Sequence, residues 1–134
     1  MRQCLFCLNP ADSKEHIWPK WILDSIKATR PIRHSIGKKV ATIIPKPELK
    51  IKCVCGFCNN GWMSSLESTN IPLLGSLIQD VSTPLDSAQQ ESIAVWIMKT
   101  AMVLDAVDTR TRTLFYTKED RDKLRVASII RLAR

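Results

Sequence analysis

Apolar positions recur at helical spacing over the C-terminal half of this 134-residue chain and alternate at strand spacing near its middle. The strongest pattern covers residues 87–107, where residues three or four apart share one face of an α-helix. Ser87 with Gln90 predicts a capping box at the start of this helix. The predicted apolar face consists of Ile93, Trp96, Ile97, Ala101, Leu104 and Val107.

Shorter helical patterns occur elsewhere in the chain. Pro19 and Pro72 each suit the first turn of a helix, because a backbone N–H in that turn has no partner within the helix. Thr117 with Asp120 predicts a capped helix near the C-terminus. The predicted helices cover residues 18–27, 59–69, 72–78 and 118–126, and the pattern at 128–132 fits either a helix or a strand.

Strand patterns are concentrated in the residues just before Cys55. Residues 39–44 and 48–54 are two β-type segments separated by a Pro-Lys-Pro step, and we expect them to form a hairpin that delivers Cys55 to its site. Residues 29–37 are predicted to be a loop, and residues 113–116 a short strand. Helices and strands together indicate the α+β class.

The length of the chain predicts one domain covering residues 1–134, large enough to bury a core. A mild change of composition near residue 70 separates a polar half that carries the candidate site, residues 1–70, from a mainly helical half, residues 71–134. Hydrophobic residues make up 45% of the sequence, which argues against a disordered tail.

The chain has a net charge of +7 and a pI of about 9.4, which favours a polyanionic partner such as nucleic acid. The start of the sequence has no apolar signal-peptide core, and the number of cysteines is odd. We therefore expect a soluble, intracellular protein in a reducing compartment, where thiols bind metals more often than they form disulfides. The apolar run from Ile93 to Met98 is too short to span a membrane.

Four cysteines form two C-x-x-C pairs, Cys4/Cys7 and Cys55/Cys58. Each such turn supplies two thiolates at a separation that suits a tetrahedral zinc ion. The two pairs therefore predict one zinc site, against the alternative that core packing placed the thiols by chance. Cys53 lacks a partner at this spacing and is predicted to be a buried strand residue. Four thiolates leave no open coordination position, so the zinc is expected to be structural.

An acid–base step, Glu15-His16, lies inside the loop that zinc would close, and Asn59 directly follows the second cysteine pair. A lone histidine is more often structural than catalytic, so this argument depends on context. His16 can take a proton from water near neutral pH, as phosphodiester hydrolysis requires. The Glu15 carboxylate and the Asn59 carbonyl are oxygen ligands of the kind that Mg²⁺ or Mn²⁺ prefers.

A zinc deaminase is disfavoured by the same residues. Such an enzyme needs a zinc ligand beside its catalytic glutamate, in the order H-x-E or C-x-E. Here the order is Glu15-His16, and the cysteines fill the predicted metal site.

These motifs resemble those of a known family. Cys-x-x-Cys, then an acid–His step, then Cys-x-x-Cys-Asn is similar to the HNH (ββα-metal) nucleases, and among them to the zinc-containing endonuclease VII-like group. The stretches Glu15–Trp21 and Cys55–Glu67, and the helical segment Ser87–Asp105, also resemble a group of bacterial and phage HNH-type proteins. The resemblance covers most of the chain, and it implies a bacterial or phage-encoded protein that acts in the host cytoplasm.

The resemblance implies a zinc-stabilised, treble-clef-like ββα-metal core followed by a helical C-terminal half. It implies that His16 is the general base, and that Glu15 and Asn59 hold a catalytic divalent ion. Two features depart from the family pattern: Glu15 stands where the family usually has Asp, and residues 38–54 contain no Asn to fix the base. His34 is expected to be a solvent-facing loop residue.

Lysines flank the predicted site on both sides and form a candidate phosphate track, although such charges are usually only a solvated surface. Trp62 is a candidate for base stacking, but packing of its helix onto the core is favoured. Trp18 and Trp21 share one helical face. The flanking lysines are Lys14, Lys20, Lys38, Lys39, Lys50 and Lys52.

Together these observations predict a metal-dependent endonuclease that hydrolyses double-stranded or branched DNA. One alternative is a catalytically inactive zinc module that binds nucleic acid or a protein partner, which the two departures from the family pattern keep open. Another is a helical protein that uses residues 87–107 as an interface, which burial of that helix would exclude.

Overall fold

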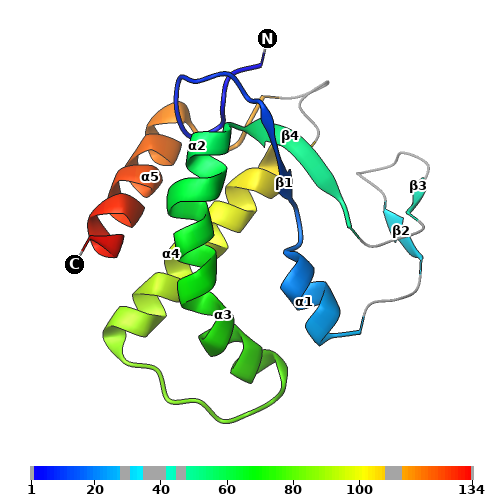
Figure 1. Cartoon of the computed structure of the whole chain (residues 1–134), viewed down its shortest axis with the longest axis vertical. Helices are drawn as coiled ribbons and strands as arrows, with labels where there is room; N and C mark the ends of the chain where they lie inside the picture. Colours follow the sequence, from blue (N-terminus) through cyan, green and yellow to red (C-terminus); the bar gives the residue numbers. More distant parts are fainter. Residues whose placement is uncertain (1, 28–30, 35–41, 45–47, 108–112, 134) are drawn as a thin grey trace.

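A computed structural model gives the fold for residues 2–27, 31–34, 42–44, 48–107 and 113–133, and Figure 1 shows its arrangement. It is a mixed α and β structure, in agreement with the predicted α+β class. Its elements are β1 (Ser13–His16), α1 (Lys20–Ser25), β2 (Ile32–His34), β3 (Thr42–Ile44), β4 (Lys50–Val54), α2 (Gly56–Cys58), the π-helical turn η1 (Asn59–Met63), α3 (Ser64–Ile78), α4 (Ser87–Asp105) and α5 (Lys118–Leu132).

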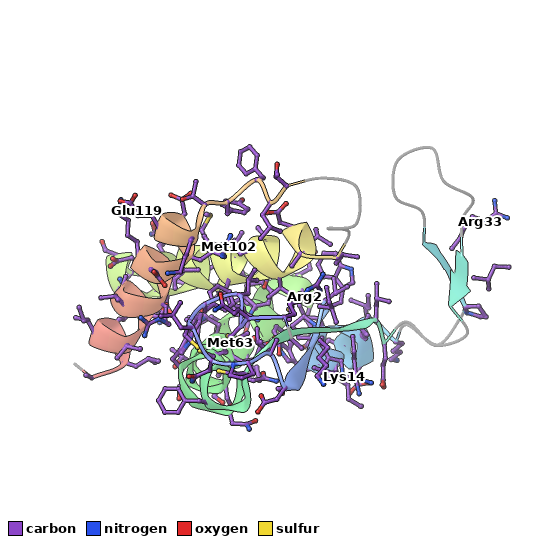
Figure 2. All side chains as sticks on the ribbon, turned by 90° about the horizontal axis from the view of Figure 1, so that it is seen from above. Arg2, Lys14, Arg33, Met63, Met102 and Glu119 are labelled. Atoms are coloured by element: carbon purple, nitrogen blue, oxygen red, sulfur yellow. The ribbon has the colours of Figure 1, made fainter. Side chains whose placement is uncertain are left out.

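The strands pair differently from the predicted hairpin. β1 pairs antiparallel with β4, and β2 pairs antiparallel with β3, so the two predicted hairpin segments belong to separate sheets. The cysteine pairs account for this pairing, because the first pair precedes β1 and the second follows β4. Bringing the four thiols together places these two strands side by side. In both views the β2–β3 pair lies away from the main body (Figures 1 and 2).

Two further predictions, one of a loop and one of a strand, are also wrong. Residues 32–34, predicted to be part of a loop, form β2. Residues 113–116, predicted to be a strand, form none. The backbone N–H groups of Phe115 and Tyr116 donate to Asp105 Oδ2 at 2.8 and 3.2 Å, so this segment folds back onto the end of α4 instead of pairing with a strand.

The helix after the second cysteine pair is longer than predicted. α2, η1 and α3 follow one another without a break from Gly56 to Ile78, and Pro72 lies inside α3. Proline removes one helical hydrogen bond, but packing of α3 against α4 offsets that loss. Gly61 has a non-helical backbone at φ −92°, ψ −113°, and marks a kink in η1.

The face that α4 buries differs in part from the predicted one. Ile97 and Leu104 are 52% and 43% exposed. The apolar periodicity predicted Trp96 but missed the rest of this face, which contains a lysine. The buried residues of α4 are Ser92, Trp96, Lys99, Met102 and Val103. The burial of this face argues against the whole helix serving as an interface.

The capping of α4 and α5 follows sequence rules. Asp86, not Ser87, caps α4 and forms a reciprocal box with Gln89, one residue before the predicted position. Thr117 and Asp120 cap α5 as predicted, but α5 continues to Leu132. Residues 128–132 are therefore helical.

The core joins the cysteine pairs to the helices. Trp62 is buried and its ring meets that of Phe6 edge to face, with centroids 5.0 Å apart, so its predicted packing role is confirmed. Met63 and Met102, both labelled in Figure 2, are each 2% exposed and belong to this core. Within the described residues, no helix is long and apolar enough to cross a membrane.

The cap of α4 gives a direct test of the fold. Asp86→Ala should lower the free energy of unfolding by about 1 kcal/mol, because the backbone N–H of Gln89 loses its side-chain acceptor, Asp86 Oδ1. Ser87→Ala is the matched control and should change stability little. Urea denaturation of both variants measures the difference, and equal losses would contradict the observed cap.

Candidate metal centre and pocket

The two cysteine pairs form one cluster. The sulfur atoms of Cys4, Cys7, Cys55 and Cys58 all lie within 4.8 Å of one another. Cys7 Sγ and Cys55 Sγ are 3.5 Å apart. Zinc–sulfur bonds of about 2.3 Å place tetrahedral sulfurs about 3.8 Å apart, so this cluster fits a zinc ion. When all described His, Cys, Asp and Glu side chains are considered, these four cysteines are the group whose ligand atoms converge in this way.

Cys53 lies outside the cluster, as predicted. Its side chain is 2% exposed on β4, and burial raises its thiol pKa to about 12. Burial also raises the pKa of Cys58, whereas Cys55 behaves differently. Burial opposes ionisation of Cys55, but the hydrogen bond from the Cys58 N–H, together with those from neighbouring thiols, lowers its pKa to about 7.

Polar residues from the first loop brace the second cysteine pair. Asp12 Oδ1 accepts a hydrogen bond of 2.7 Å from the Gly56 N–H, at the start of the helical run. Asn9 Nδ2 lies 3.9 Å from Cys55 Sγ, within the range of a weak N–H···S contact. These contacts hold the loop before β1 against the turn after β4, and so orient both halves of the cysteine cluster.

A pocket of about 500 Å³ lies beside the cluster and unites the candidate residues. Glu15, His16 and Asn59 all line it, together with Trp21 of α1 and Glu67 of α3. A larger hollow of about 700 Å³ is lined only by residues of α5, so it is a helix surface without converging candidate groups. The pocket therefore contains the predicted acid, base and amide.

The register of β1 and β4 explains how neighbouring residues reach this pocket from two sides. Glu15 pairs with Ile51, and His16 pairs with Lys50. Successive side chains of a strand point to opposite faces. Glu15 therefore extends inward toward α4, whereas His16 lies on the outer face at the end of the ladder.

Asn59 joins the helix to β1. Its Nδ2 donates to Ser13 Oγ at 2.8 Å and to the Lys14 carbonyl at 3.1 Å. With the amide nitrogen used in this way, the side-chain carbonyl is the atom of Asn59 that remains to bind a cation. The two hydrogen bonds also fix this carbonyl relative to the start of β1.

His16 is half-buried and lines the pocket. Its Nε2 atom is buried and has no hydrogen-bond partner among the described residues. A buried nitrogen without a partner costs free energy, so the fold holds this ring at some cost to stability.

Glu15 contacts a buried cation that lies far away in the sequence. Lys99 Nζ lies 3.3 Å from Glu15 Oε1 and 3.3 Å from Glu67 Oε2, and the Lys99 side chain is 2% exposed. Glu67 also accepts hydrogen bonds from the indole N–H groups of Trp21, at 2.5 Å, and Trp96, at 2.6 Å. Burial raises the pKa of Glu15, and Lys99 opposes that effect.

Sequence reasoning did not assign roles to Glu67 and Lys99. Both occur in stretches that carry the family resemblance, but neither matches a cysteine, acid–His or terminal Asn position. A signal was present: Lys99 follows Trp96 by three residues and so shares its helical face. A charged residue at a core-facing position predicts a buried counter-charge.

The outer face of the β1–β4 ladder is basic. Lys14 pairs with Lys52 across the strands, next to His16 and Lys50, and all three lysines are exposed. Lys20 is exposed on α1 and binds Asp24 at 2.8 Å. Lys38 and Lys39 lie outside the described residues, as does the side chain of His34. Trp18 is 45% exposed, whereas Trp21 packs against Trp96.

Comparison of the chain with family models, curated proteins and solved structures gives no match. The resemblance to the HNH nucleases therefore depends on the motifs themselves.

The cysteine cluster gives the second prediction. The purified protein should contain one zinc ion per chain, and a strong chelator should unfold the half of the chain that the metal closes. Cys55→Ala should abolish zinc binding, because it removes a ligand. The matched control Cys53→Ala should retain zinc at a modest cost in stability. Elemental analysis and circular dichroism check both, and loss of zinc from Cys53→Ala would contradict the ligand set.

Proposed function

We propose that the protein is a zinc-stabilised, metal-dependent endonuclease of the HNH type that hydrolyses DNA phosphodiester bonds. The observation that carries this proposal is the pocket that unites Glu15, His16 and Asn59. The antiparallel β1–β4 pair followed by the helix after Cys58 supports the ββα arrangement that such a site needs. The cysteine cluster supports the structural zinc.

The proposed residues have distinct roles. His16 takes a proton from a water molecule, and the water oxygen then forms a bond to phosphorus while the bond to the leaving oxygen breaks. Glu15 and Asn59 supply oxygen atoms, the ligand type that Mg²⁺ or Mn²⁺ prefers. When bound, this ion would supply Lewis acidity at the phosphate. Burial of Glu15 beside the pocket keeps its carboxylate in a fixed position.

The distribution of charge supports nucleic acid as the partner. Residues 26–54, which follow α1 and end with β4, contain eight Lys or Arg residues and one acid. Their net charge of +7 equals that of the whole chain. The remainder of the chain is neutral in sum. Lys50 of this segment pairs with His16, which lines the pocket.

The lysine pair on the ladder supports the same partner. Lys14 and Lys52 lie directly opposite each other, and like charges at opposed positions destabilise a sheet. A phosphate backbone along this face would neutralise that repulsion. Arg33, on the separate β2–β3 pair, stands apart from the body and adds a further positive charge to the same segment (Figure 2).

A zinc module that binds nucleic acid without cleaving it is the second candidate. The contact between Lys99 and Glu15 favours it, because one carboxylate oxygen is already paired with a cation. The burial of His16 Nε2 favours it as well. Both candidates share the basic ladder, and they differ only in turnover.

Turnover is tested by the third prediction. Wild-type protein with Mg²⁺ or Mn²⁺ should cleave supercoiled plasmid, and His16→Ala should lower the rate by about 100-fold or more, because the general base is lost. His34→Ala is the matched control and should retain activity. Zinc content and DNA binding should be unchanged in both variants. Salt-sensitive binding without cleavage by the wild type would favour the non-catalytic module.

The fourth prediction concerns the ladder. Lys52→Thr should weaken DNA binding and make the negative slope of log affinity against log salt shallower by about 1, because one phosphate contact is lost. The same change should slightly raise the unfolding midpoint, because it removes a like-charge pair. Lys123→Ala on α5, where the lysine pairs with Glu119, is the control and should leave the slope unchanged. Equal slopes for all three proteins would exclude the ladder as the binding surface.

A further inference from the structure

The contact between α4 and the pocket is made by one buried ammonium group. Of the charged residues that the structure describes, Lys99 is the one that is buried. Its Nζ atom lies between two carboxylates, at 3.3 Å from each. It also lies 5.9 Å from the centre of the Trp96 ring, which adds a cation–π contact. These contacts leave the ammonium a single position.

This position has the surroundings of a cation site. Oxygen atoms of Glu15 and Glu67 approach it from β1 and from α3, and carboxylates in such an arrangement are the usual ligands of hard divalent ions. Two indole N–H groups hold Glu67 in place. Two carboxylates around one ammonium leave a net negative charge beside the pocket.

We propose that Lys99 is a positioning residue that occupies the cation place between Glu15 and Glu67, and so leaves Glu15 a single oxygen, Oε2, for an ion in the pocket. This inference rests on the proposed metal site. The sequence motifs leave α4 outside the site. The proposal gives α4, through Lys99, control over where an ion binds and how tightly.

A buried ion cluster often stabilises a fold no better than apolar residues of the same size, but removal of one partner leaves the other charges unpaired and costs stability. Replacement of Lys99 alone therefore lowers stability whether its role is structural or positioning. It also leaves two carboxylates facing each other, with both oxygens of Glu15 free to bind a divalent ion, and this second effect on ion binding distinguishes the two roles.

The experiment measures Mn²⁺ binding to zinc-loaded protein by electron paramagnetic resonance. Manganese is suitable because it prefers oxygen ligands over the cysteine thiolates. Lys99→Met should bind Mn²⁺ at least about tenfold more tightly than wild type, since a nearby positive charge is lost and ligand oxygens are released. Lys99→Arg keeps the charge and should retain the wild-type affinity.

Glu67→Gln provides a change of opposite sign. Lys99 would then pair with Glu15 alone, and the pocket would lose one negative charge, so Mn²⁺ should bind more weakly than in wild type. A purely structural role for the cluster predicts lower melting temperatures in both variants and no gain of affinity in Lys99→Met.

A folded, zinc-containing Lys99→Met protein with unchanged or weaker Mn²⁺ affinity would overturn the proposal. If that variant fails to fold, unchanged or tighter binding by Glu67→Gln overturns it instead. Failure of the proposed function gives a different result: wild type then neither binds Mn²⁺ at Glu15 nor cleaves DNA. In that case, Mn²⁺ binding gained in Lys99→Met and lost again in Lys99→Met/Glu15→Ala still supports the role of Lys99.

Discussion

Convergence of the four thiols is the constraint on which the rest of the structure depends. It joins the turn at Cys4 and Cys7 to the turn at Cys55 and Cys58, and so closes the loop formed by residues 8–54. Closing a loop of this length has an entropic cost that a metal bond can offset. Once it is closed, β1 and β4 have to run side by side, and the helix after β4 begins beside the start of β1. The pocket exists because of that juxtaposition.

A second long-range connection, made by charged side chains instead of cysteines, completes the candidate site. Glu15, Glu67 and Lys99 come from β1, α3 and α4, and two indole groups direct the Glu67 carboxylate. The cysteine cluster positions the backbone that carries the candidate residues. The buried ion cluster fixes the orientation of one of their side chains. The two connections therefore act at different levels of the same site.

The parts of this fold that follow local rules could be predicted from the sequence. The α1 region, the cap of α5 and the grouping of the cysteines depend on residues close together or on a fixed two-residue spacing. The strand pairing could not be predicted in this way, because residues 39–44 and 48–54 are neighbours that pair with other partners.

The buried face of α4 was also beyond local reasoning. Periodicity treats a lysine as a surface residue, and the two acids that make burial of Lys99 favourable lie 84 and 32 residues away. The same limit applies to the site: the motif gave Glu15, His16 and Asn59, but not the cation that restrains the first of them.

The opposed lysines on the ladder have a consequence for the unbound protein. A strand pair held together against like-charge repulsion is less stable alone than when an anion covers it, and binding to the folded state alone shifts the folding equilibrium. The β1–β4 pair would then fluctuate less when an anion is bound to it than when it is free. Hydrogen exchange at the amides of β4 would thus serve as an internal sensor of polyanion binding.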